Sequence, residues 1–232
     1  MRIFRQTSKN TIKIKIQRQD INFADCVATL EEYAKDAYDS DWYVDAHKWA
    51  ADIAQKFNYP LETVVAVTAL LSPLTEWNLN KRRAIRVLEA WNEGNKISVH
   101  TVQTMTQVYA CLSGQQFNFG PKTGAFYDCI MRPYESKDVV IDSLAASIVV
   151  GFGEIPGTYN LKENVLLMVK DVYREVANRY NVAPNRLQAA TWEKANIARK
   201  GNRGLGAKAH GVFVSQPEVT LQPKELLSLL KF

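Results

Sequence analysis

Apolar residues recur at helical spacing along most of the chain, and this pattern limits the fold more than any other feature. From Phe23 onward, Ala24, Val27 and Leu30 follow one another at three-residue steps, which places them on one face of a helix. Similar stripes or helix boundary signals mark residues 44–57, 61–71, 79–91, 101–112, 121–131, 143–150, 162–180 and 184–199. Nine helices joined by short loops predict a mainly all-α fold.

The two ends of the chain differ from this pattern. Residues 11–17 (TIKIKIQ) alternate isoleucine with polar residues, so we expect residues 1–20 to form an N-terminal arm or a short edge strand without a strong partner later in the chain. Residues 21–232 are expected to form a single helical domain. Residues 194–210 combine basic residues with glycines and no acid, which predicts a flexible basic loop.

Composition indicates which kind of binding partner and which cellular compartment to expect. The net charge of +5 favours an anionic partner without requiring one. The three cysteines are widely spaced, so they predict neither a disulfide framework nor a four-cysteine iron–sulfur site, and no cofactor is expected. No run of about 18 apolar residues occurs, and the basic N-terminus lacks an apolar signal core, so we expect a cytoplasmic protein without a membrane partner.

The turn at residues 116–123 (QFNFGPKT) is the segment best suited to bind an anion. Asn118 and Gly120 are the residues in it that best tolerate a positive φ. Pro121 suits the first position of the helix that follows, where its missing N–H costs nothing. Backbone N–H groups and the positive end of the helix dipole at such a start form a phosphate-binding geometry.

The string FNFGPKTGAF resembles the hairpin of the helix-hairpin-helix DNA glycosylases, the superfamily of endonuclease III and 8-oxoguanine glycosylase. Alignment on Gly120 puts Lys122 at the position of the family's catalytic lysine. The family's catalytic aspartate begins a helix about twenty residues later, where this chain has Asp142 after an apolar run. Residues 69–78 (ALLSPLTEWN) resemble a third family segment, which approaches the lesion.

The resemblance implies a two-lobed fold and a set of site residues. Lys122 and Asp142 would be catalytic, and Glu76 and Trp77 would line the base pocket or wedge into the base stack. The DNA-binding residues expected on the hairpin and the basic segment are Asn118, Gly120, Thr123, Lys200 and Arg203. Double-stranded DNA is the implied partner, and the sequence leaves the oligomeric state open.

Several residues depart from the family pattern. Asn118 replaces the first hairpin glycine, Gly124 replaces an alanine, and Leu144 replaces a histidine that is common after the aspartate. The family's frequent iron–sulfur cysteines are absent, so the resemblance is to a remote member. The string at residues 188–192 (QAATW) resembles bacteriophage proteins and suggests a viral origin, which would place the protein in the host cytoplasm.

Each candidate residue also has a structural interpretation. Lys122 would be a solvated lysine that contacts phosphate as a point charge, and Asp142 would be the N-cap of the next helix. Trp77 would be a core residue, and His47 would be an ordinary side chain without a metal. Gln188 and Trp192, one helical turn apart, would share a face through core packing.

Three functions follow from the resemblance. The first is a DNA N-glycosylase that flips out a damaged or modified base, with abasic-site lyase activity if the Lys122 amine attacks C1′. The second is a phage enzyme that modifies the flipped base, by replacing a pyrophosphate on hydroxymethylated thymine with an amine. The third is a DNA-binding protein that keeps the hairpin but has no catalytic activity.

Overall fold

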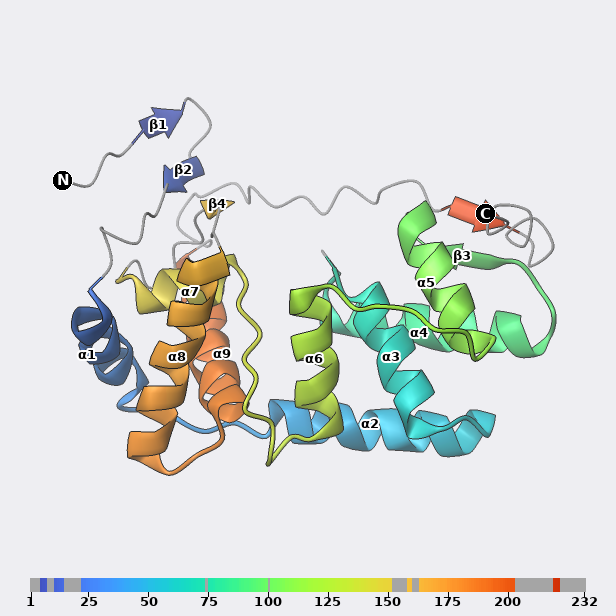
Figure 1. Ribbon diagram of the computed structural model, residues 1–232, viewed down its shortest axis with the longest axis horizontal. Coiled ribbons are helices and arrows are strands. Elements are labelled where there is room, and N and C mark those ends of the chain that lie inside the picture. Colours follow the sequence, from blue (N-terminus) through green and yellow to red (C-terminus); the bar gives the residue numbers. More distant parts are fainter. Residues whose placement is uncertain are drawn as a thin grey trace. The chain divides into compact units, whose positions relative to one another are not determined.

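The helices lie where the sequence pattern predicts them. The structure, a computed structural model, describes residues 5–7, 11–14, 22–73, 75–99, 101–151, 158–159, 163–202 and 219–221. The helices in those ranges are α1 Phe23–Ala34, α2 Trp42–Phe57, α3 Leu61–Leu71, α4 Trp77–Asn92, α5 Val102–Leu112, α6 Pro121–Met131, α7 Ser143–Val149, α8 Glu163–Tyr180 and α9 Pro184–Asn202. This confirms the mainly α-helical fold class (Figure 1).

The chain divides into two compact units, which we describe separately. Unit 1 comprises residues 1–45 and 132–211, and unit 2 comprises residues 46–131 and 212–232. The single helical domain expected over residues 21–232 stays a prediction.

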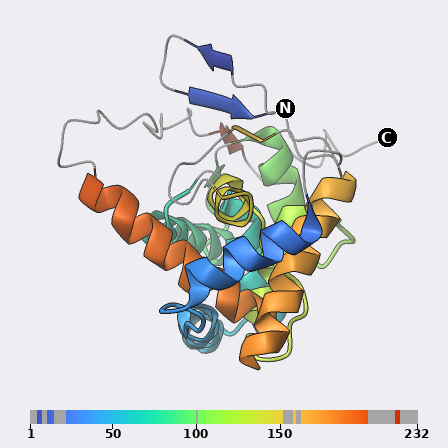
Figure 2. The same ribbon diagram turned by 90° about the vertical axis from the view of Figure 1, so that its left-hand side faces the viewer.

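Unit 1 is built around α7, whose residues from Leu144 to Val149 are all buried. Helices α1, α8 and α9 pack against it, and Figure 2 shows α1 crossing in front of α8 and α9 with α7 seen almost end-on. The core between these helices includes Leu30, Tyr173 and Leu187, none of which has accessible surface. A helix that is apolar on all sides is stable only when other elements cover it completely, which α7 achieves here.

Unit 2 is likewise built around one buried helix, α3. The residues of α3 from Val64 to Leu71 are all buried, and α4, α5 and α6 pack against them. The buried Asn80 of α4 donates from Nδ2 to the Thr68 carbonyl oxygen of α3 at 3.0 Å, so one polar contact joins the two helices within an apolar core.

Short strands complete both units. In unit 1, β2 (Thr11–Ile14) lies between β1 (Arg5–Thr7), which is antiparallel to it, and β4 (Thr158–Tyr159), which is parallel to it. In unit 2, β3 (Ile97–Val99) pairs antiparallel with β5 (Val219–Leu221). The alternative of an edge strand is wrong, because β2 lies between β1 and β4 in its sheet. The partner that follows later in the chain, β4, is only two residues long.

No helix in the described part of the chain combines the length and the hydropathy of a membrane-spanning segment.

Candidate functional site

The turn before α6 differs in part from its prediction. Helix α6 begins at Pro121 as expected, and the Gly120 carbonyl oxygen accepts its first helical hydrogen bond from the Gly124 N–H at 2.8 Å. Neither Asn118 nor Gly120 has a positive φ, so that expectation is wrong. The positive φ in the described connection between α5 and α6 belongs to Gly114 (φ +70°), directly after the α5 C-cap Ser113.

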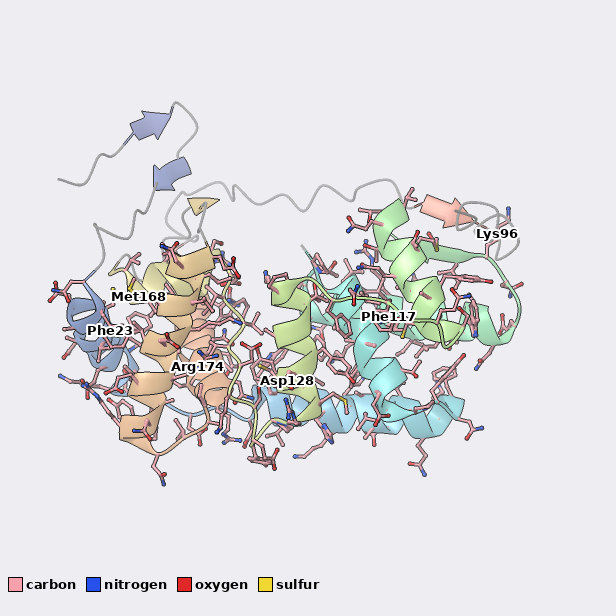
Figure 3. The ribbon with its side chains drawn as sticks, viewed as in Figure 1. Phe23, Lys96, Phe117, Asp128, Met168 and Arg174 are labelled. Carbon is pink, nitrogen blue, oxygen red and sulfur yellow. The ribbon has the colours of Figure 1, made fainter. Side chains whose placement is uncertain are left out.

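Aromatic contacts hold this turn against α6. Phe119 stacks on Tyr127 with ring centroids 4.9 Å apart, and Phe117 meets Phe119 edge-on at 5.0 Å (Figure 3 labels Phe117). Gln107 Nε2 of α5 also donates to the Asn118 carbonyl oxygen at 2.9 Å. The turn is therefore fixed to the two helices that flank it, although its tip at Asn118 and Gly120 is exposed.

Lys122 lies in the first turn of α6 and its side chain is exposed. Among the residues that the structure describes, it has no ion-pair or hydrogen-bond partner, whereas the neighbouring Thr123 is half-buried. An exposed cation at a helix start is available to an anion from outside. The same exposure means that burial does not supply the desolvation that a lysine nucleophile requires.

Asp142 is the N-cap of α7, as the structural interpretation of this residue predicted. Its Oδ1 accepts hydrogen bonds from the backbone N–H groups of Leu144 at 3.0 Å and Ala145 at 2.8 Å. Its Oδ2 accepts a third from the indole Nε1–H of Trp192 on α9, also at 3.0 Å. Three donors thus hold this half-buried carboxylate in one orientation.

Other polar groups of the unit 1 core are also paired. The buried Tyr173 hydroxyl donates to the Ala145 carbonyl oxygen at 3.3 Å, and burial raises the pKa of Tyr173 well above its usual value. Gln188 Oε1 accepts from the Tyr43 hydroxyl at 3.0 Å. Gln188 is buried and Trp192 packs against the core cluster, so core packing explains why these two residues share a face.

Lys122 and Asp142 belong to different units of the chain: Lys122 to unit 2 and Asp142 to unit 1. Their common participation in one active site stays a prediction.

Glu76 and Trp77 have structural roles at the start of α4. Glu76 is exposed and caps the helix, accepting from the Leu79 N–H through Oε2 at 3.1 Å. Trp77 packs edge-on against Trp49 and Phe126, with ring centroids 5.4 and 6.4 Å away. These contacts favour the core interpretation of Trp77, and a base-pocket or wedge role for either residue stays a prediction.

The expected basic loop is partly helical. Because α9 continues to Asn202, the prediction of a loop from residue 194 is wrong over its first nine residues. Lys194 is bound within unit 1, since its ammonium donates to the Tyr33 carbonyl oxygen at 2.8 Å and pairs with Asp36. The side chain of Lys200 and all of Arg203 lie outside the described residues.

Histidine and cysteine side chains form no metal centre in the described part of the chain, where no group of three potential His, Cys, Asp or Glu ligands occurs. His47 donates from Nδ1 to the Ile130 carbonyl oxygen at 2.9 Å, which is an ordinary structural contact. Burial raises the pKa of the Cys111 thiol to about 11, so this cysteine is suited to packing and not to nucleophilic attack.

Sequence reasoning did not predict the contact between Trp192 and Asp142, because 50 residues separate them.

Comparison with known proteins identifies a family to which no activity is assigned. A family of unknown function, DUF7178, matches residues 21–200. No curated protein and no solved structure matches the chain.

Proposed function

Since the chain belongs to the DUF7178 family, whose function is unknown, we propose from its own residues that it is a DNA N-glycosylase that flips out a damaged or modified base and cleaves its glycosidic bond. We include in this proposal the two-lobed helix-hairpin-helix glycosylase fold. The observation that supports DNA binding most strongly is the exposed start of α6, where Lys122 has no partner among the described residues.

The turn before α6 can approach a phosphate closely. A methyl group added at Gly120 would meet no described atom within 4 Å, so the backbone of Gly120 itself is accessible. The positive end of the α6 dipole and the Lys122 ammonium both favour an anion there. Such backbone contacts position a duplex without reading its sequence, and they hold the strand while a nucleotide is extruded.

Asp142 is the carboxylate we propose for catalysis. Positive charge develops on the sugar as the C1′–N bond breaks, and a carboxylate already held by Leu144, Ala145 and Trp192 can stabilise that charge without reorganising. Water adds to C1′, and the base leaves with a proton. Because Lys122 is exposed, we assign it to phosphate contact, so the product is an intact abasic site.

The test uses uracil-containing, oxidised-base and abasic duplexes, with released base and borohydride-trapped adducts as readouts. Asp142→Asn should abolish base release while DNA binding remains, because the amide keeps an oxygen for the cap and loses the charge. Lys122→Gln should weaken binding and reduce its salt dependence. Lys96→Gln is the matched control, since Lys96 is another exposed lysine of unit 2 (Figure 3).

Each result separates the candidate functions. A trapped adduct that disappears in Lys122→Ala would assign Lys122 as a nucleophile and make the enzyme a lyase. Salt-dependent binding without base release or adduct on any of these duplexes would refute the glycosylase proposal. It would leave either the enzyme that modifies hydroxymethylated thymine or the non-catalytic DNA-binding protein.

A further inference from the structure

Helix α4 carries a concentrated positive charge that has no role in the function proposed so far. Four of the six residues from Lys81 to Arg86 are basic. Two of them are bound within unit 2: the Lys81 ammonium lies 5.6 Å from the centre of the Trp77 ring, and Arg83 Nη1 donates to Thr75 Oγ1 at 3.2 Å. The other two, Arg82 and Arg86, are exposed and lie one helical turn apart.

Arg82 and Arg86 differ from the other described arginines. Every other arginine whose side chain is described makes a hydrogen bond, an ion pair or another polar contact within the protein. These arginines are Arg83, Arg132, Arg174, Arg179, Arg186 and Arg199. Within the described ranges, Arg82 and Arg86 make none. Like charges four residues apart also destabilise a helix, and only Arg86 has an opposite charge one turn away, at Glu89, so the stability of α4 does not explain the pair.

The surface around these two arginines fits a phosphate backbone better than an apolar partner. Asn78, one turn before Arg82, is exposed on the same face and can donate hydrogen bonds. The exposed large hydrophobic residues of the described chain are Phe23, Tyr38, Val102, Tyr134, Leu167 and Ile197, and none of them lies on α4. This face therefore offers two arginines and an amide, followed one turn later by the half-buried Glu89, and it has no large exposed hydrophobic residue to anchor a membrane or a protein groove.

The spacing of the two cations also suits DNA. Four residues of α-helix advance by about 6 Å, while phosphates follow one another every ~3.4 Å along the duplex axis on each strand. Two long arginine side chains from adjacent turns can therefore reach phosphates that lie one or two nucleotides apart on one strand.

We propose that Asn78, Arg82 and Arg86 of α4 form a second contact with the backbone of duplex DNA, in addition to the start of α6. This inference rests on the DNA binding proposed above. Helices α4 and α6 both pack against α3 within unit 2, and the Trp77 ring meets the Phe126 ring edge-on at 6.4 Å. The two contacts are thus carried by one packed group of helices.

The experiment measures the affinity of the full chain for a labelled duplex between 50 and 200 mM salt. Each phosphate contact adds about 0.9 to the slope of log affinity against log salt. Arg82→Gln/Arg86→Gln should therefore reduce the slope by about 2 and make the loss of affinity across this range about twelvefold smaller. Arg82→Lys/Arg86→Lys should keep the slope, and Lys96→Gln should leave it unchanged.

The outcomes distinguish this contact from the proposed function. If the wild-type chain shows no salt-dependent binding, both proposals fail. If it binds and Lys122→Gln lowers the slope while Arg82→Gln/Arg86→Gln does not, the α4 contact is refuted and the α6 contact stands. A circular dichroism spectrum and an unfolding midpoint equal to those of the wild type verify that the glutamine variant is folded.

Discussion

Replacing Asp142 with alanine tests how the structure holds its candidate carboxylate, whatever the reaction. The change removes the acceptor of two backbone N–H groups at the start of α7 and of the Trp192 indole N–H. Because Leu144 and Ala145 are buried, their unpaired N–H groups gain little compensation from water. We therefore expect a large loss of stability from the removal of one half-buried side chain.

The magnitude follows from the individual contacts. Loss of an aspartate N-cap costs about 0.5–2 kcal/mol. A donor left without its acceptor costs about 1–3 kcal/mol, and Trp192 is only half-buried, so the lower end applies to it. Together these contributions give a decrease of roughly 1.5–4 kcal/mol in the free energy of unfolding. Asp142→Asn keeps Oδ1 as the cap and loses only the Trp192 contact, so we expect about 1–2 kcal/mol.

Urea denaturation followed by circular dichroism measures these differences. Asp171→Ala is the matched control, because Asp171 is an exposed carboxylate on α8 of the same unit and pairs with Arg174 (labelled in Figure 3). Removing an exposed partner of this kind costs at most about 1 kcal/mol. A double-mutant cycle between Asp142→Asn and Trp192→Phe gives the energy of the indole contact alone.

Two results would refute this reasoning. If Asp142→Ala costs no more than Asp171→Ala, the three hydrogen bonds do not stabilise α7. If Asp142→Asn costs as much as Asp142→Ala, the cap through Oδ1 is not the source of the effect.

Two further predictions concern stability in acid and the two glycines between α5 and α6. Hydrogen bonds from Arg186 hold the pKa of Asp39 below its usual 3.8, so this pair adds stability above that pH and loses it as the pH falls through the folded-state pKa. Arg186→Gln should thus lower the unfolding midpoint at pH 7, and its difference from the wild type should shrink below about pH 4; a difference independent of pH would contradict this. Gly114→Ala should lower the free energy of unfolding by about 1–2 kcal/mol, because φ is +70° at Gly114. Gly120→Ala should lower it by under about 0.5 kcal/mol and should still weaken DNA binding. Equal losses of stability in thermal unfolding would be evidence against the φ values of these two glycines.

Local features of the chain were predictable because their physical causes lie within a few turns. The repeat of apolar residues predicted the position of each helix, and Pro121 predicted the start of α6. The role of Asp142 as a cap was predictable for the same reason, because the N–H groups that donate to it belong to residues two and three positions later. The φ values of Asn118 and Gly120 were not predictable in this way, and the positive φ of this connection falls at Gly114.

The amino-acid sequence by itself determined the helical class, the helix positions and the exposed start of α6 with Lys122. Only the tertiary structure decided which polar groups meet: Trp192 reaches Asp142 across 50 residues, and Lys194 is bound to Tyr33 and Asp36. It also left Arg82 and Arg86 without partners in the part of the chain that the structure describes. The physical reason is that helical periodicity depends on neighbouring residues, whereas the pairing of a charge depends on which distant elements the packed core brings beside it.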